Sequence, residues 1–215
     1  PLPFAESGCE IVGVDIASLR IEQARTFFAQ RNQTGTFIAS DIFQLKDLEK
    51  HFPLILIHDV IEHIETKSKF LSGMKSYLSA GGVIFIAFPA WQMPFGGHQQ
   101  IARGRVVSHL PFIHLLPRVL YKWILDTGGE EEDTIKELLS IKETKCTIEM
   151  FRNLVKQTGY QIVDQQLFFI NPHYEVKFGL SPRKLGRVLS SIPYLRNFFS
   201  TSCFYLLKKA EEKES

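Results

Sequence analysis

The stretch CEIVGVDIAS, residues 9–18, indicates how this chain is built. It contains a short run of branched apolar residues that ends at Asp15, which is typical of a parallel strand buried on both faces. Ser18 is the candidate cap of a helix that follows. That helix is expected to bury three apolar side chains at helical spacing: Ile21, Ala24 and Phe28. The stretch therefore predicts a strand and a helix that meet at a carboxylate.

The same alternation continues on both sides of this stretch. PLPFAESG is predicted to be the end of a helix that stops at Gly8. Strands are predicted at GTFIASD (35–41), FPLILIHD (52–59) and GGVIFIAFP (81–89), and a helical pattern covers residues 60–78. The order strand, helix, strand, strand, helix, strand predicts an α/β fold with a doubly wound, mostly parallel sheet.

The sequence changes in character after the last of these strands. The expected elements are an aromatic and amide-rich loop at 90–100, an apolar and basic helical segment at 108–125, a short helix at 134–140, a helix capped by Thr147 that ends at Gly159, and strands at 160–170 and 202–209. We therefore predict a single domain over residues 1–215, with a helical cap inserted at about residues 90–146 and an antiparallel last strand.

Composition limits the classes of protein that fit. The chain has 215 residues and a formal net charge of +2, which is too small to indicate nucleic-acid binding. The three cysteines lie far apart with no CxxC pair, so neither a disulfide framework nor a zinc site is indicated, and a cytoplasmic location is expected. The apolar segment 109–123 either covers an apolar acceptor or rests on a membrane surface as a peripheral contact, and the more common alternative is a cap helix that packs on its own domain. Oligomeric state does not follow from the sequence.

Two acidic residues end neighbouring predicted strands. Asp15 is placed to accept hydrogen bonds from the hydroxyls of a ribose, and Asp41 from an exocyclic amine such as that of adenine. Ile16 and Ile42 are the candidate side chains on either side of the ring. The alternatives are a helix-terminal role for Asp15 and a turn in which Asp41 binds its own backbone. Together the two carboxylates describe an adenosine pocket.

A third cluster, HDVIEH, follows the most apolar predicted strand. If the helix starts at once, Asp59, Glu62 and His63 share one face and offer half of a divalent metal site. A charged first helical turn is the favoured interpretation.

In order and spacing, VGVDIA, ASDIF, LILIHDVIEHI and GGVIFIAFP resemble the class I S-adenosylmethionine-dependent methyltransferases, and within them the type 11/12 group with the ubiquinone-type O-methyltransferases. The resemblance implies a Rossmann-like fold, S-adenosyl-L-methionine as cofactor, and methyl transfer to a small-molecule or lipid-like acceptor at oxygen. It implies that Asp15 binds the ribose, that Asp41 and Ile42 contact adenine, and that His58 lines the methionine part. Some relatives with an acidic-x-x-Glu-His sequence bind a divalent cation. Asp59, Glu62 and His63 match that pattern, with Asp in place of the more usual Glu, and His98 is a candidate additional ligand.

Methyl transfer from a sulfonium is an in-line displacement, so the protein mainly aligns the reactants. A hydroxyl acceptor also needs a base, for which His98 and His58 are the candidates because neutral imidazole accepts a proton near physiological pH. Trp91, Phe95 and His98 follow the fourth predicted strand and are the candidate acceptor-binding residues. The alternatives are lid packing for Trp91 and a loop role for His98.

The main departure from the family is that the sequence contains neither the first strand nor the glycine-rich loop of the GxGxG type. We therefore expect an N-terminally truncated methyltransferase with two unpaired sheet edges, in which cofactor binding and activity are weakened or lost. Two other functions stay open. One is a nicotinamide-dependent oxidoreductase, and the other is a non-catalytic binding module on a decayed methyltransferase fold.

Overall fold

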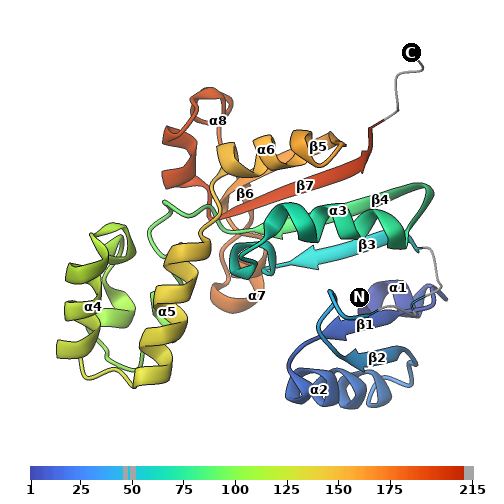
Figure 1. Cartoon of the computed structure of the whole chain (residues 1–215), viewed down its shortest axis with the longest axis horizontal. Coiled ribbons are helices and arrows are strands. Elements are labelled where there is room, and N and C mark those ends of the chain that lie inside the picture. Colours follow the sequence, from blue (N-terminus) through green and yellow to red (C-terminus); the bar gives the residue numbers. More distant parts are fainter. Residues whose placement is uncertain (46–47, 49–51, 211–215) are drawn as a thin grey trace. The chain divides into compact units, whose positions relative to one another are not determined.

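A computed structural model describes residues 1–45, 48 and 52–210 of the chain. The chain forms two compact units, residues 1–50 and residues 51–215, which are described separately below (Figure 1).

The N-terminal unit contains α1 (Leu2–Glu6), β1 (Val12–Asp15), α2 (Ser18–Ala29) and β2 (Thr36–Ala39). The two strands are parallel, and Asp15 lies opposite Ala39. The core is formed by Ala5, Ile21, Phe28 and Phe37, with Ala24 packed against it. The predicted buried face of the helix is therefore confirmed.

The caps of the N-terminal unit were predicted only in part. Gly8 follows α1 with a φ of +85°, which confirms it as a stop signal. The prediction that Ser18 caps α2 is wrong, because the cap residue is Ala17. The carboxylate of Asp15 instead accepts a hydrogen bond from the Ala17 backbone amide at 2.8 Å.

The C-terminal unit has a five-stranded sheet in the order β3-β4-β7-β5-β6. Its strands are β3 (Phe52–His58), β4 (Leu78–Phe88), β5 (Tyr160–Ile170), β6 (Arg183–Lys184) and β7 (Ser202–Lys209). Strand β3 pairs with β4 in parallel, and β7 runs antiparallel to both β4 and β5. The mixed α/β fold with a reversed last strand is therefore confirmed.

Two helices, α3 (Lys67–Tyr77) and α6 (Ile148–Gln157), lie side by side along this sheet (Figure 1). Aromatic packing joins α6 to the sheet. The ring centroid of Phe151 lies 4.8 Å from that of Phe88 and 4.7 Å from that of Tyr205. As predicted, Thr147 caps α6 by accepting a hydrogen bond from the Met150 amide at 3.1 Å.

The segment between β4 and α6 forms a helical layer with its own core. It contains the 3-10 turns η2 (Gln99–Ile101), η3 (Val107–His109) and η4 (Ile113–Leu115), and the helices α4 (Arg118–Thr127) and α5 (Glu132–Thr144). Tyr121, Leu125 and Leu138 are fully buried inside it. The last part of the unit adds α7 (His173–Phe178), α8 (Arg187–Ser191) and η5 (Leu195–Phe199), which the sequence did not predict.

Several predicted boundaries were wrong. The helical pattern 60–78 forms only the 3-10 turn η1 (Ile61–His63) and α3, because residues 64–66 leave the helix. Strand β4 begins at Leu78, three residues before the predicted strand. The segment 108–125 is broken into two turns and α4 by its prolines, and α5 is longer than the predicted helix 134–140.

Within the described residues, β1 pairs only with β2 and β3 pairs only with β4. Each of these strands therefore has an edge without a strand partner, as the sequence predicted. In the same part of the chain, no helix combines the length and the apolar character needed to cross a bilayer.

Candidate functional site

In the N-terminal unit, the parallel register brings two carboxylates to one edge of the β1–β2 sheet. Asp15 is the last residue of β1, and Asp41 follows the end of β2 by two residues. The Ser40 backbone amide donates a hydrogen bond to the Asp15 backbone carbonyl at 3.0 Å. The segments that follow β1 and β2 therefore leave the sheet at the same level. This is the carboxyl edge of the strands, where ligands bind in open α/β sheets.

Each of these carboxylates also makes a local hydrogen bond through one oxygen. Oδ1 of Asp15 accepts from Ala17, and Oδ1 of Asp41 accepts from the Phe43 amide at 2.9 Å. Oδ2 of Asp15 lies 3.8 Å from an Arg20 guanidinium nitrogen. A carboxylate accepts about four hydrogen bonds, so these contacts fix the orientation of both groups and leave acceptor capacity for a ligand. Ile16 and Ile42 flank them, and Ile16 is 78% exposed.

In the C-terminal unit, the end of β3 carries His58 and Asp59. Asp59 has a φ of +52°, a left-handed conformation that Asp tolerates, and its amide donates to the Ala87 carbonyl at 2.9 Å. Its carboxylate lies 3.1 Å from Nδ1 of His58. That hydrogen bond is the main cause that raises the pKa of His58, against the opposing effect of burial.

Glu62 lies in the 3-10 turn η1 and is almost completely buried. Neither of its carboxylate oxygens has a hydrogen-bond partner among the described residues. Burial is the largest cause that raises the pKa of Glu62 to about 8, and the charge of Asp59 adds to it. A buried carboxylate without hydrogen-bond partners is costly, so it indicates a ligand or a function.

The loop after β4 brings His98 to this carboxylate. Gly96 and Gly97 make this possible, because a Cβ atom would lie 2.3 Å from the Trp91 carbonyl oxygen at the first position and 2.2 Å from the Cβ of His114 at the second. His98 then adopts a φ of +57°. Its Nε2 lies 3.7 Å from Oε1 of Glu62.

Glu62, His63 and His98 each offer one ligand atom, and these three atoms lie within 4.8 Å of one another. The imidazole rings of His63 and His98 meet edge to face at 5.1 Å between centroids. A carboxylate and two imidazoles form a donor set that transition-metal ions use. Asp59 is not part of this cluster, because the predicted helix does not start at residue 60, and the shared face of Asp59, Glu62 and His63 does not form.

The two candidate bases differ in their surroundings. Burial is the main cause that lowers the pKa of His98, and the neighbouring His63 adds to the effect. His98 is therefore a neutral imidazole near pH 7, whereas His58 is half-exposed and its pKa is shifted in the opposite direction. Of the two imidazoles, His98 is the one that burial keeps neutral.

The two aromatic candidates lie in the same loop. Trp91 is buried, and its ring packs edge to face on His114 at 4.6 Å between centroids. Its amide donates to the Cys146 carbonyl at 3.0 Å. Phe95 is half-buried, and its carbonyl accepts from the His98 amide at 3.0 Å. Trp91 therefore shapes the loop, while Phe95 is the more accessible of the two.

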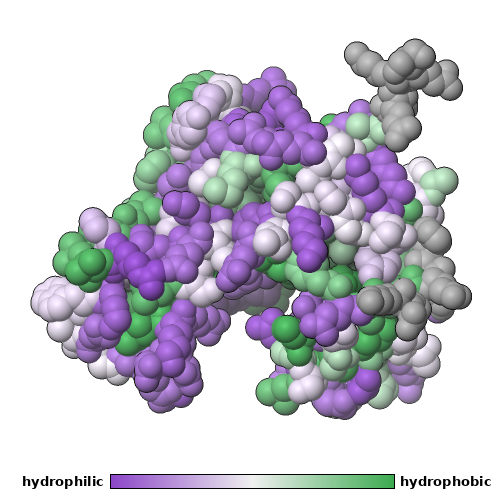
Figure 2. Space-filling model, viewed as in Figure 1, coloured by the Kyte–Doolittle hydropathy of each residue, from purple (hydrophilic) through white to green (hydrophobic). Residues whose placement is uncertain are grey.

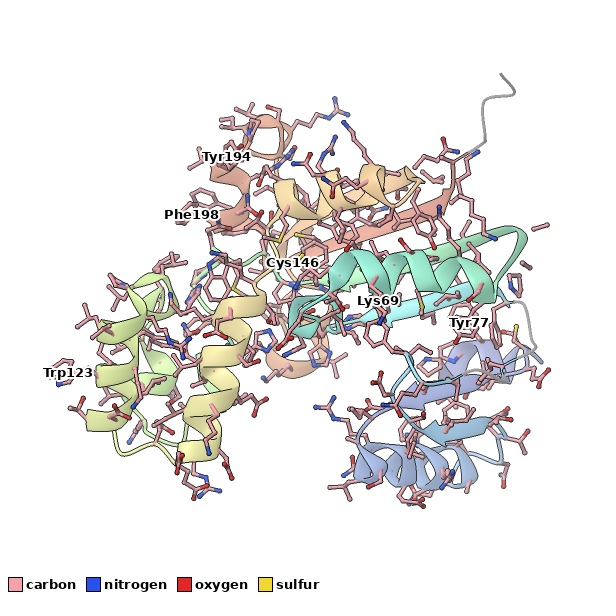
Figure 3. All side chains as sticks on the ribbon, in the orientation of Figure 1. Lys69, Tyr77, Trp123, Cys146, Tyr194 and Phe198 are labelled. Atoms are coloured by element: carbon pink, nitrogen blue, oxygen red, sulfur yellow. The ribbon has the colours of Figure 1, made fainter. Side chains whose placement is uncertain are left out.

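Lys67 is a buried residue next to this cluster that the sequence analysis missed. Its ammonium group donates to the Ile64 and Thr144 carbonyls, so it joins the start of α3 to the end of α5. Burial lowers its pKa, and Glu62 and the nearby thiol of Cys146 influence it in the opposite direction (Cys146 is labelled in Figure 3). The Thr144 carbonyl lies 77 residues further along the chain, so the sequence carries no signal for this link.

Comparison with known proteins adds to this geometry. A family model described as a methyltransferase domain matches residues 4–108. A ubiquinone biosynthesis O-methyltransferase of Brucella ovis is 28% identical over 85 residues, which cover 40% of this chain and 34% of that protein. The chain thus spans about a third of the length of this curated relative.

Two solved structures share the fold. A magnesium protoporphyrin IX methyltransferase from Synechocystis PCC 6803 with bound SAH aligns with a TM-score of 0.53 at 13% identity, covering 97% of this chain and 67% of the other. An S-adenosylmethionine-dependent methyltransferase from Clostridium acetobutylicum aligns with a TM-score of 0.55 at 11% identity, covering 94% and 76%.

Proposed function

Because this chain belongs to the class I S-adenosylmethionine-dependent methyltransferases, we propose that it takes part in methyl transfer from S-adenosyl-L-methionine to an oxygen atom of a small-molecule or lipid-like acceptor. The observation that carries the proposal is the pair of carboxylates at the carboxyl edge of β1 and β2. Asp15 accepts from the ribose hydroxyls, and Asp41 with Ile16 and Ile42 holds the adenine. His58 lines the methionine part. We also propose that residues 1–215 form one domain, with the helical cap at about residues 90–146.

The bound cofactor supplies a methyl group on a positively charged sulfur. The protein holds the acceptor in line with that bond and excludes water, which contributes at most about 7–11 kcal/mol to lowering the barrier. His98 removes the proton of the acceptor hydroxyl at Nε2, the nitrogen that lies 3.7 Å from Oε1 of Glu62. Phe95 and Trp91 shape the acceptor side of the loop.

Isothermal titration of S-adenosylhomocysteine into the product of the complete reading frame tests the adenosine site. Asp15→Asn and Asp41→Asn are each expected to weaken binding at least tenfold, because each removes a charged acceptor. Glu22→Gln is the matched control, since it removes an exposed carboxylate of the same unit. Tighter binding of a nicotinamide dinucleotide would instead favour an oxidoreductase, and no nucleoside binding would favour a non-catalytic module.

A second candidate function rests on the unpartnered carboxylate of Glu62. Glu62, His63 and His98 would hold a divalent cation, and that ion would polarise the acceptor oxygen. In this alternative His98 is a ligand and not the base. The three ligand atoms lie within 4.8 Å of one another, and small side-chain movements would bring them to coordination distance from a common ion.

Thermal unfolding with Mn²⁺, Zn²⁺ or Mg²⁺ distinguishes the two roles of His98. A metal site predicts that one of these ions raises the Tm of the wild type but not that of Glu62→Gln or His98→Gln. Glu65→Gln, which removes an exposed carboxylate beside η1, should keep the response. If no ion raises the Tm while His98→Gln still abolishes methyl transfer, His98 acts as a base.

We also propose a cytoplasmic location. All three cysteines, Cys9, Cys146 and Cys203, are free thiols, and two of them are buried. This is the usual state in a reducing compartment. Fractionation of cells that express the protein from its own promoter tests this location. Recovery of the protein only from an oxidising compartment would contradict the proposal.

A further inference from the structure

Residues 187–198, here called the tip segment, present an unusual number of apolar side chains to solvent. The segment contains α8 and all of η5 except its last residue, Phe199. Val188 is 76% exposed and Tyr194 is 69% exposed, and Ile192, Leu195 and Phe198 are exposed as well. Figure 2 shows hydrophobic residues gathered over α8, and Figure 3 shows Tyr194 and Phe198 on this outer edge of the unit. Exposed apolar patches of this kind mark interaction surfaces.

The exposure is built into the backbone. Tyr194 lies at the centre of a γ-turn with φ +64° and ψ −48°, closed by a hydrogen bond from the Leu195 amide to the Pro193 carbonyl at 2.7 Å. This form of γ-turn is rare and strained, and a bulky residue seldom adopts it. The turn points an aromatic side chain outward at an energetic cost, which indicates a role for that side chain.

A buried polar network holds the turn in place. The carboxylate of Glu149 accepts from the Tyr194 amide at 3.0 Å and pairs with Arg196 at 2.9 Å. Asn197 donates to the same carboxylate at 2.6 Å and accepts from the Ile148 amide at 2.8 Å. The tip segment is therefore fixed to the start of α6, and its apolar side chains are exposed on a rigid support.

The surroundings of the tip segment are positively charged. Residues 176–198 contain five Lys or Arg and no Asp or Glu. Arg183, Lys184 and Arg187 are exposed, and among the described residues none of them forms an ion pair. A polar cavity of about 370 Å³ beside them is lined by Arg152, Lys184 and Arg196, with Asp164 as its one carboxylate.

We propose that the tip segment and these cations form a surface that binds an anionic phospholipid membrane. The Val188 and Tyr194 side chains enter the boundary between headgroups and acyl chains, where aromatic rings with a polar end are favoured. Arg183, Lys184 and Arg187 meet the negative headgroups. Charge complementarity favours this occupant. The exposed apolar side chains lie next to the unpaired cations Arg187 and Lys184, and a lipid interface is likewise apolar below a negative surface.

Co-sedimentation of the full chain with vesicles tests the proposal. Equimolar phosphatidylglycerol and phosphatidylcholine should bind the chain, phosphatidylcholine alone should bind it far less, and binding should fall as salt is added. The double variant Lys184→Glu, Arg187→Glu should lower the partition coefficient at least tenfold, since each cation near such a surface contributes about fivefold. Val188→Ser should lower it severalfold, and so should Tyr194→Asn, whose new side chain tolerates a positive φ.

A matched control lies on α4, where Val119 is 83% exposed and Trp123 is 59% exposed (Trp123 is labelled in Figure 3). Val119→Ser, Trp123→Ser should keep vesicle binding and the circular dichroism spectrum of the wild type. The proposal is wrong if this control loses binding while the tip variants keep it, or if no vesicle binds the wild type. It is also wrong if inorganic phosphate displaces the chain at the same ionic strength at which chloride does not, because the cavity would then be a site for free phosphate.

Discussion

His114 is the buried histidine whose protonation state the structure fixes. It is fully buried, and its Nε2 lies 2.7 Å from the Trp91 carbonyl oxygen, so Nε2 carries a proton and donates it. Its Nδ1 has no hydrogen-bond partner among the described residues. Protonating Nδ1 would bury a charge and leave a donor unsatisfied. Burial accordingly lowers the pKa of His114 to about 4.

This arrangement makes stability depend on pH. The folded-state pKa lies below the ordinary value of 6.5, so the unfolded chain binds the proton more tightly and stability is lost as the pH falls from 6.5 towards 4. Between pH 7.5 and pH 5, the wild type should lose about 2 kcal/mol more unfolding free energy than His114→Gln. Urea titrations at both pH values measure it. His109→Gln, which removes an exposed histidine, should behave like the wild type, and equal losses in all three proteins would contradict the prediction.

At the scale of single elements, α2 and α6 differ in how they begin. Thr147 caps α6 with its side chain, whereas Ser18 lies inside α2 and makes no cap hydrogen bond. Thr147→Ala should therefore cost about 1 kcal/mol of unfolding free energy. Ser18→Ala should change it by less than about 0.5 kcal/mol. Chemical denaturation measures both, and a larger loss for Ser18→Ala would restore the cap that the sequence predicted.

The loop after β4 depends on a glycine for steric reasons. A Cβ at Gly97 would lie 2.2 Å from the Cβ of His114, so Gly97→Ala should cost about 1–3 kcal/mol and displace His98. Gly73 in the exposed part of α3 has no atom within 4 Å of its Cβ position, so Gly73→Ala should stabilise by about 0.5–1 kcal/mol. Denaturation curves of the two variants give the comparison. If both substitutions raised the unfolding free energy, the close packing described for the loop after β4 would be contradicted.

At the scale of the whole molecule, the two units contain sheets of different size. Strand β7 has partners on both sides in the five-stranded sheet, whereas β1 and β2 form a two-stranded sheet. A two-stranded sheet is only marginally stable, and local opening follows local stability. Native-state hydrogen exchange should therefore show amides 203–207 protected at least about a hundredfold more than amides 36–39. Equal protection would mean that both units open only together.

The sequence alone determined the strands and their polar ends. Branched apolar runs closed by Asp15, Asp41 and His58 are local patterns, and local patterns suffice to predict buried parallel strands and the carboxylates that follow them. The cap at Thr147 was equally local. Ser18 failed as a cap because it is already the first residue of the helix and Ala17 takes the cap position, a shift of one residue that spacing alone does not resolve.

Tertiary structure decided the rest of the candidate site. The sequence suggested His98 as an added ligand, but its approach to Glu62 and His63 depends on two chain segments 35 residues apart meeting at one strand edge. The lack of a hydrogen-bond partner for the Glu62 carboxylate and the exposure of the γ-turn at Tyr194 likewise depend on the residues that pack around them. Burial is a property of the assembled molecule, so the pKa of Glu62 and the exposure of the tip segment became visible only after the chain had folded.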